Sequence, residues 1–91
     1  MDHLYPFKEA SESLIMQVWQ KGIAIIGHDS AIWRKDICGT WMQFSKHGDT
    51  SSKYGWEIDH KKPQSKGGSD DISNLQPLQW ENNRRKGDEY P

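Results

Sequence analysis

The segment Tyr54–Asp88, YGWEIDHKKPQSKGGSDDISNLQPLQWENNRRKGD, decides the fold of this chain. Its first residues alternate between apolar and polar, as a half-buried strand does, and reach an Asp59-His60 pair where that strand is expected to end. The following stretch, Lys61–Asn74, is rich in Gly, Ser, Asp and Pro, which predicts an irregular loop. Two polar side chains able to do chemistry therefore stand at a junction between regular and irregular structure.

The end of this segment predicts a helix, and the residues before the segment predict a second strand. Because Pro77 disfavours helical geometry at the residue before it, the last helix is expected to begin at or after Pro77 and to end near Gly87. Upstream, residues 41–44 form another strand-like run, so we expect a hairpin with the strand that starts at Tyr54. The connection Ser45–Lys53 is longer than a tight hairpin loop and predicts a mobile segment.

The first part of the chain carries helical patterns. Apolar residues recur at helical spacing over Pro6–Lys21, and Gly22 then serves as the stop, which predicts an amphipathic helix. A second, shorter helix is expected after a cap at Asp29 or Ser30, with Gly39 at its end. Helices followed by a separate hairpin and a final helix indicate the α+β class.

Length and composition limit the other possibilities. A chain of 91 residues fits one domain, and with 33% hydrophobic residues and five Trp the core must be small and rich in aromatic side chains. One cysteine, Cys38, excludes an internal disulfide. No apolar run is long enough to cross a bilayer, so a soluble cytoplasmic protein without a membrane partner is expected. The net charge of −1 gives no global support for a nucleic-acid partner, so that case depends on local arrangement.

The spacing of four polar residues carries a resemblance to a known family. Asn74 follows His60 by 14 positions and Asn83 follows it by 23. With the Asp59-His60 pair, this pattern strongly resembles the HNH endonucleases of bacteria and phages, whose ββα-metal core folds two strands, a loop and a helix around one metal ion. The resemblance implies a single HNH domain over residues 1–91, with a helical part over 1–39 and the ββα-metal core over 40–88.

The resemblance also implies a role for each matching residue. Asp59 would bind the metal, His60 would be the general base, Asn74 would hold the loop and His60 in place, and Asn83 would be the second protein ligand of the metal. Many members have His at this last position. The Asn here is similar instead to the HNH domain of the RNA-guided CRISPR nucleases, a difference that affects which metal is bound.

The chemistry of the residues agrees with these roles. Imidazole titrates near neutrality, so a neutral His60 can take a proton from water at physiological pH. Carboxylate and amide oxygens, as offered by Asp59 and Asn83, are hard ligands that suit Mg²⁺, with Mn²⁺ as the alternative ion.

A structural zinc is not expected. Many small HNH proteins bind one through two C-x-x-C pairs. The positions that correspond to the four thiolates here are Cys38, Trp41, Gln79 and Asn82, so three of them are missing.

Three basic residues, Arg84, Arg85 and Lys86, form a cationic cluster on the last helix that is expected to contact phosphates. An ordinary solvated helix end is the competing interpretation of this cluster. The function implied is a Mg²⁺-dependent endonuclease that hydrolyses the phosphodiester bonds of double-stranded DNA in the cytoplasm of a bacterial or phage-infected cell. A catalytically silent nucleic-acid-binding module and a protein-interaction domain stay open as alternatives, as does a protein partner or a dimer.

Overall fold

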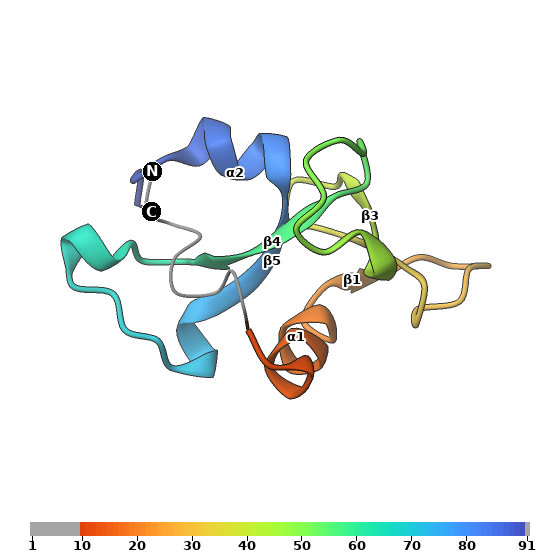
Figure 1. Ribbon diagram of the computed structural model, residues 1–91, viewed down its shortest axis with the longest axis horizontal. Coiled ribbons are helices and arrows are strands. Elements are labelled where there is room, and N and C mark those ends of the chain that lie inside the picture. The colour runs from red at the N-terminus through yellow and green to blue at the C-terminus, as the bar shows by residue number, and fades with distance from the viewer. Residues whose placement is uncertain (1–9, 91) are drawn as a thin grey trace.

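The computed structural model describes residues 10–90 and contains two helices and two small antiparallel sheets (Figure 1). The helices and strands follow one another as α1 (Glu12–Trp19), β1 (Ile23–Ala24), β2 (Trp33–Lys35), β3 (Trp41–Gln43), β4 (Trp56–His60), β5 (Leu75–Gln79) and α2 (Trp80–Lys86). Three short 3-10 helices lie in the connections, at Phe44–Lys46, Gln64–Lys66 and Ile72–Asn74. This is the α+β class expected from the sequence.

Helix α1 is shorter than the sequence predicts. Of the predicted range Pro6–Lys21, residues 6–9 lie outside the described residues, and the described helix begins at Glu12 because the extended Ser11 caps it. The Ser11 side chain accepts a hydrogen bond from the backbone N–H of Leu14, which satisfies one of the free donors at the helix start. The helix ends at Trp19, before the predicted stop at Gly22.

The second predicted helix is wrong. The Asp29 carbonyl accepts hydrogen bonds from the N–H groups of Ile32 and Trp33, which makes a single turn, and the chain then enters strand β2. β2 lies between β1 and β3 in a three-stranded sheet, with Trp33 opposite Gln43. Ile37, which lies within the range predicted for this helix, is 71% exposed. Cross-strand pairing of a bulky aromatic residue therefore overrides a weak helical pattern.

The predicted hairpin between residues 41–44 and the strand that starts at Tyr54 is also wrong. β4 pairs with β5, while β3 pairs with β2, so the loop 45–53 crosses from one sheet to the other. The backbone bonds Lys61 N–H to Asn74 O and Trp80 N–H to Gly55 O bracket the β4–β5 ladder, and they make Ile58–Pro77 a pair without hydrogen bonds. Pro77 is accommodated because its missing N–H would point away from β4.

The last helix follows its prediction. α2 begins at Trp80, after Pro77, and ends at Lys86, with Gly87 at its C-cap. The Gln79 side chain caps its first turn by accepting from the N–H groups of Glu81 and Asn82.

The hydrophobic core lies between α1 and the β4–β5 sheet. Trp19 and Trp56 have ring centroids 5.2 Å apart, and each indole N–H donates to a backbone carbonyl, of Ser30 and Phe44 respectively. The buried members of this core are Val18, Trp19, Met42, Trp56, Ile58 and Leu75. Figure 1 shows α1 and α2 on opposite sides of β4 and β5, so one face of the sheet is free for polar contacts with α2. None of the described helices is long and apolar enough to span a membrane.

Candidate active site

Strand β4 places its two carboxylates, Glu57 and Asp59, on the face toward α2. Trp56 and Ile58 point into the core, so the alternation of a strand turns Glu57 and Asp59 to the other face. Glu57, Asp59 and His60 are each at most 2% exposed. Buried ionisable groups are retained only with partners or ligands, so the contacts of each group decide what it does.

Asp59 is held from two sides. Its Oδ2 accepts a hydrogen bond of 2.9 Å from the Gln76 amide, which lies directly opposite on β5. The Lys86 ammonium lies 3.2 Å from both carboxylate oxygens and donates to the backbone carbonyl of His60 at 2.8 Å. The predicted metal ligand is therefore fixed in position and already faces a cation.

Asn83 is fully buried on the same face. Its Nδ2 donates to Glu57 Oε1 at 2.8 Å, and the Arg84 guanidinium donates to the same oxygen at 2.6 Å. In the part of the chain that the structure describes, Asn83 Oδ1 and Glu57 Oε2 are buried without a hydrogen-bond partner. Such atoms cost roughly 1–3 kcal/mol each. Two of them side by side in one small protein require an explanation.

His60 ends β4 and contacts a carboxylate from the following loop. Its Nε2 lies 2.7 Å from Asp70 Oδ1, and the Asp70 side chain is 58% exposed. Because a carboxylate only accepts, Nε2 carries the proton of this bond. Gln64 donates to the same Asp70 oxygen at 3.2 Å, which orients the carboxylate.

Asn74 closes the loop that begins after His60. Its Oδ1 accepts from the backbone N–H of Lys62, and its Nδ2 donates to the carbonyls of Lys62 and Ser69. A Cβ on Gly68 would lie 1.7 Å from the Lys62 carbonyl oxygen, so only glycine allows the loop to close this tightly. The contacts of Asn74 therefore fix the loop that carries Asp70.

The comparison with family models identifies the family. The family model of the HNH endonuclease matches residues 43–89, just over half of the chain. The chain belongs to the HNH endonuclease family. Neither the comparison with curated proteins nor the comparison with solved structures gives a significant match. In this HNH domain, the two strands and the helix of the core are β4, β5 and α2.

The three basic residues of the HNH helix are engaged within the protein. Arg84 donates to Glu57, Arg85 donates to Asn82 Oδ1 at 2.8 Å, and Lys86 contacts Asp59. Arg85 alone of the three is classed as exposed along α2. The helix end is therefore part of the polar network of the site.

A hydrogen-bonded junction occupies the region where zinc-binding HNH proteins place their thiolates. Asp36, 1% exposed, accepts from the N–H groups of Cys38 and Thr40 with Oδ1, and from Gln79 N and Asn82 Nδ2 with Oδ2. These four bonds of 2.9–3.0 Å connect the turn before β3 to the start of α2. We call this cluster the Asp36 junction.

The residues of the site fit a hard divalent cation. Among residues 10–90, no group of three or more His, Cys, Asp and Glu side chains is arranged to hold a metal ion. The predicted set is different: one carboxylate, Asp59, and one carboxamide, Asn83, whose buried oxygen has no partner. Oxygen donors with room for waters are the preference of Mg²⁺.

The sequence interpretation missed two residues of the site. Glu57 lies two positions before Asp59, so the strand period alone could have placed it on the same face. Asp70 lies in an irregular loop, where no periodicity gives the direction of a side chain.

Proposed function

We propose that this HNH protein is a metal-dependent endonuclease that hydrolyses the phosphodiester bonds of double-stranded DNA. The observation that carries the proposal is Asn83 Oδ1, which among residues 10–90 is buried without a hydrogen-bond partner, on the side of the sheet to which β4 turns Asp59, the residue before His60. A protein retains such an oxygen at a cost in stability when a ligand satisfies it. Membership of a family of endonucleases supports the reaction class.

Asp59 and Asn83 are the residues proposed to hold the ion, Mg²⁺ or Mn²⁺. When bound, the ion neutralises charge on the phosphoryl oxygens and stabilises the departing oxygen. Glu57 orients the Asn83 amide: since Glu57 Oε1 takes the Nδ2 proton, Oδ1 is the atom presented as a ligand. Lys86 neutralises Asp59 in this structure, and it would have to leave the carboxylate for Asp59 to hold the ion.

His60 is proposed as the general base. The Asp70 carboxylate holds the proton on Nε2, which orients the ring and leaves Nδ1 as the acceptor of the neutral imidazole. The same carboxylate stabilises the imidazolium that forms when the ring takes a proton from water. Asn74 acts through the loop, because its three hydrogen bonds fix the segment that presents Asp70.

DNA is the proposed partner. Arg84, Arg85 and Lys86 contribute positive charge on the last turn of α2, beside the site, where a DNA backbone would be attracted.

One observation favours a second candidate, a catalytically silent nucleic-acid-binding module. The Lys86 ammonium already neutralises Asp59, and an ion pair of this kind competes with a divalent cation. This alternative predicts DNA binding without metal-dependent cleavage.

A plasmid assay tests the proposal. Supercoiled plasmid is incubated with purified protein and Mg²⁺, Mn²⁺ or EDTA, beside His60→Ala and the control His28→Ala, which changes an exposed histidine. We expect nicking with either ion, none in EDTA, and a loss of about 10²–10⁴-fold in His60→Ala alone. Nicking that survives EDTA or His60→Ala defeats the mechanism, and DNA binding without nicking establishes the silent module.

A further inference from the structure

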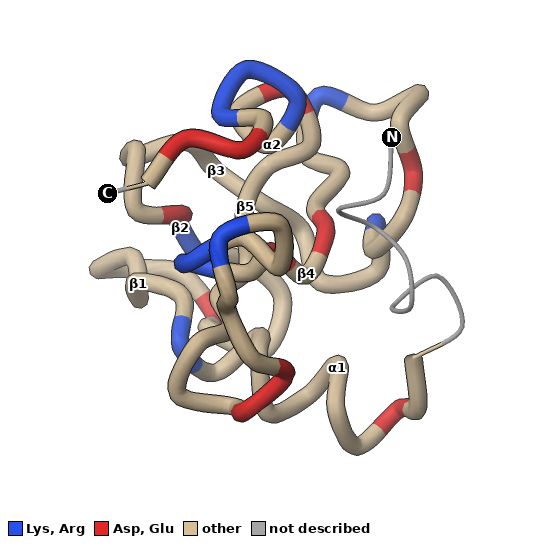
Figure 2. The backbone as a smooth tube through the Cα atoms, turned by 90° about the vertical axis from the view of Figure 1, so that its left-hand side faces the viewer, with Lys and Arg blue, Asp and Glu red and all other residues tan. Residues whose placement is uncertain are grey.

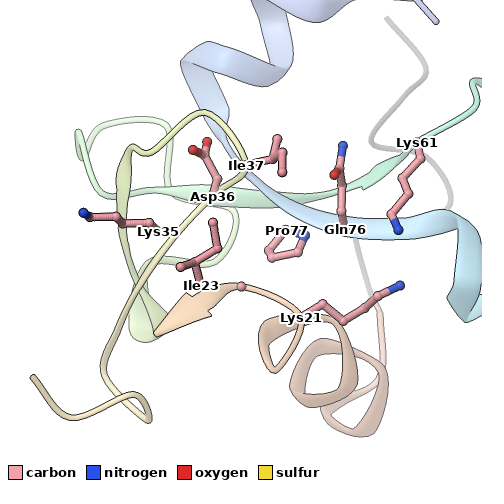
Figure 3. Close-up of a pocket in the computed structure, with 9 residues that line it drawn as sticks. Lys21, Ile23, Lys35, Asp36, Ile37, Lys61, Gln76 and Pro77 are labelled. Atoms are coloured by element: carbon pink, nitrogen blue, oxygen red, sulfur yellow. The ribbon is translucent and has the colours of Figure 1, made fainter. Parts of the chain in front are cut away.

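A groove on the outer edge of β5 is lined by positively charged side chains that do not belong to the basic cluster on α2. It lies between β5 and the β1–β2 strands, has a volume of about 170 Å³, and is lined by residues that include Lys21, Lys35, Lys61, Gln76 and Pro77. Figure 3 shows Lys21 and Lys61 reaching toward one another across the edge of β5, while Lys35 points away from them. We call this feature the Lys21–Lys61 groove.

The two ammonium groups have different protein contacts. Lys21 donates to the backbone carbonyls of Ile72 and Leu75, the latter at 2.6 Å, which uses two of its three protons. The Lys61 side chain makes no hydrogen bond or ion pair with any described residue. The pKa of Lys21 is lowered, first by burial and then by the charge of Lys61, which shows that the two charges repel one another across the groove.

No carboxylate of the described residues neutralises the groove. Asp36 is the acidic residue that lines it, and its two oxygens are occupied by the four hydrogen bonds of the Asp36 junction. In Figure 3 its carboxylate points away from Lys21 and Lys61. An anion placed between the two ammonium groups would therefore relieve a repulsion that the protein itself leaves uncompensated.

The position of the groove connects it to the candidate active site. Lys61 directly follows His60 in the chain. A second depression, of about 350 Å³, shares Ile37, Lys61 and Gln76 with the groove and extends to Lys86, which contacts Asp59. Figure 2, which looks onto this side, shows basic stretches at the end of α2 and near β5. The two depressions thus run from Lys21 past Lys61 to Lys86, with Glu89 also lining the second.

We propose that the Lys21–Lys61 groove binds a backbone phosphate of the DNA. This phosphate would flank, on the same DNA strand, the phosphate held at Asp59 and His60. The inference rests on the proposed function for its substrate and adds a binding site that the helix residues do not supply. Arg84 and Lys86 are tied to buried carboxylates, whereas Lys61 points into an open groove and is available to a ligand. Binding in the groove would fix the path of the DNA strand across the protein surface.

DNA binding measured in EDTA tests the groove separately from cleavage. A fluorescent duplex of about 20 base pairs is titrated with wild type, Lys61→Gln, Lys61→Glu and the control Lys53→Gln, between about 50 and 200 mM NaCl. Lys53 is exposed and lies outside the groove. We expect Lys61→Gln to weaken binding several-fold and to lower the slope of log K against log salt by about 0.9, with a larger loss in Lys61→Glu and none in Lys53→Gln.

Lys21→Gln is measured with its melting temperature, because this change also removes the bonds to two backbone carbonyls. If Lys61→Gln binds DNA with the wild-type slope, or if the wild type does not bind, the groove proposal is overturned. Lys61-dependent binding of inorganic phosphate that leaves DNA binding unchanged at constant ionic strength would assign the groove to the free ion and also overturn it. A Lys61-dependent slope in a protein that never nicks plasmid supports the groove and overturns the proposed hydrolysis.

Discussion

Two buried carboxylate centres contact the same helix, α2, and they are built in opposite ways. At the start of the helix, both oxygens of Asp36 accept two hydrogen bonds each. At its later turns, Glu57 Oε2 and Asn83 Oδ1 are buried and have no hydrogen-bond partner among the described residues. The first centre stabilises the fold, while the second sacrifices stability for oxygen atoms that a ligand can use. Complete and incomplete hydrogen bonding therefore separate structural from functional polar groups in this protein.

The largest effect is expected at Asp59. Asp59→Asn keeps the size of the side chain but removes the negative charge proposed to hold the ion, so cleavage should fall by about 10²–10³-fold. Since Asp59 is buried and both Lys86 and Gln76 contact its carboxylate, the unfolding free energy should also fall, by about 1–3 kcal/mol. Plasmid nicking and thermal melting measure the two effects, with Asp71→Asn as the exposed control. Full activity in Asp59→Asn contradicts the proposed site.

The same chemical change at Asp36 should act on stability. In Asp36→Asn an amide NH₂ replaces one oxygen and faces two donors that then have no acceptor, so we expect a loss of about 2–4 kcal/mol. In a domain of this size the melting temperature falls by roughly 10–30 °C. Denaturant unfolding and calorimetry measure the loss. A melting temperature within a few degrees of wild type would contradict the contrast between the two carboxylate centres, because the Asp36 junction would then not be needed for stability.

The smallest effect is expected at Glu57. Glu57→Gln retains an acceptor for Asn83 Nδ2 but allows the amide to reverse, so affinity for Mn²⁺ should fall by about tenfold. The unfolding free energy should change less than in Asp36→Asn, because the ion pair with Arg84 is lost but a buried charge is removed with it. Titration calorimetry with Mn²⁺ alone measures the affinity without reference to cleavage. Unchanged affinity together with a large loss of stability would make Glu57 a structural residue like Asp36.

Several features of the fold were predictable from local patterns. The strand before His60 and the helix from Trp80 follow from alternation, Pro77 and Gly87, all of which act within a few residues. Strand β5 was missed because its sequence, LQPLQ, has no β-branched or aromatic residue and contains a proline. Its presence depends on pairing with β4, and the helical pattern before β2 likewise gives way to pairing with β3. Partners distant in the chain leave no local signal.

The candidate site divides in the same way. The intervals between His60, Asn74 and Asn83 are visible in the sequence because a family pattern fixes them, and the roles assigned to these residues stay predictions. The contact between Lys86 and Asp59 depends on the packing of α2 against β4, which spacing along the chain does not give. The convergence of Lys21 and Lys61 depends on α1 lying beside β5, and is equally invisible in the sequence.

The Asp36 junction has a practical consequence for work on this protein. The joint between the turn before β3 and the start of α2 is built from hydrogen bonds between groups of the chain, which a chelator does not disrupt. Under the proposed function, EDTA should abolish cleavage and lower the melting temperature only by the amount that binding of the ion contributes, and returning Mg²⁺ should restore both without refolding. Cleavage can then be switched off in a protein that stays folded.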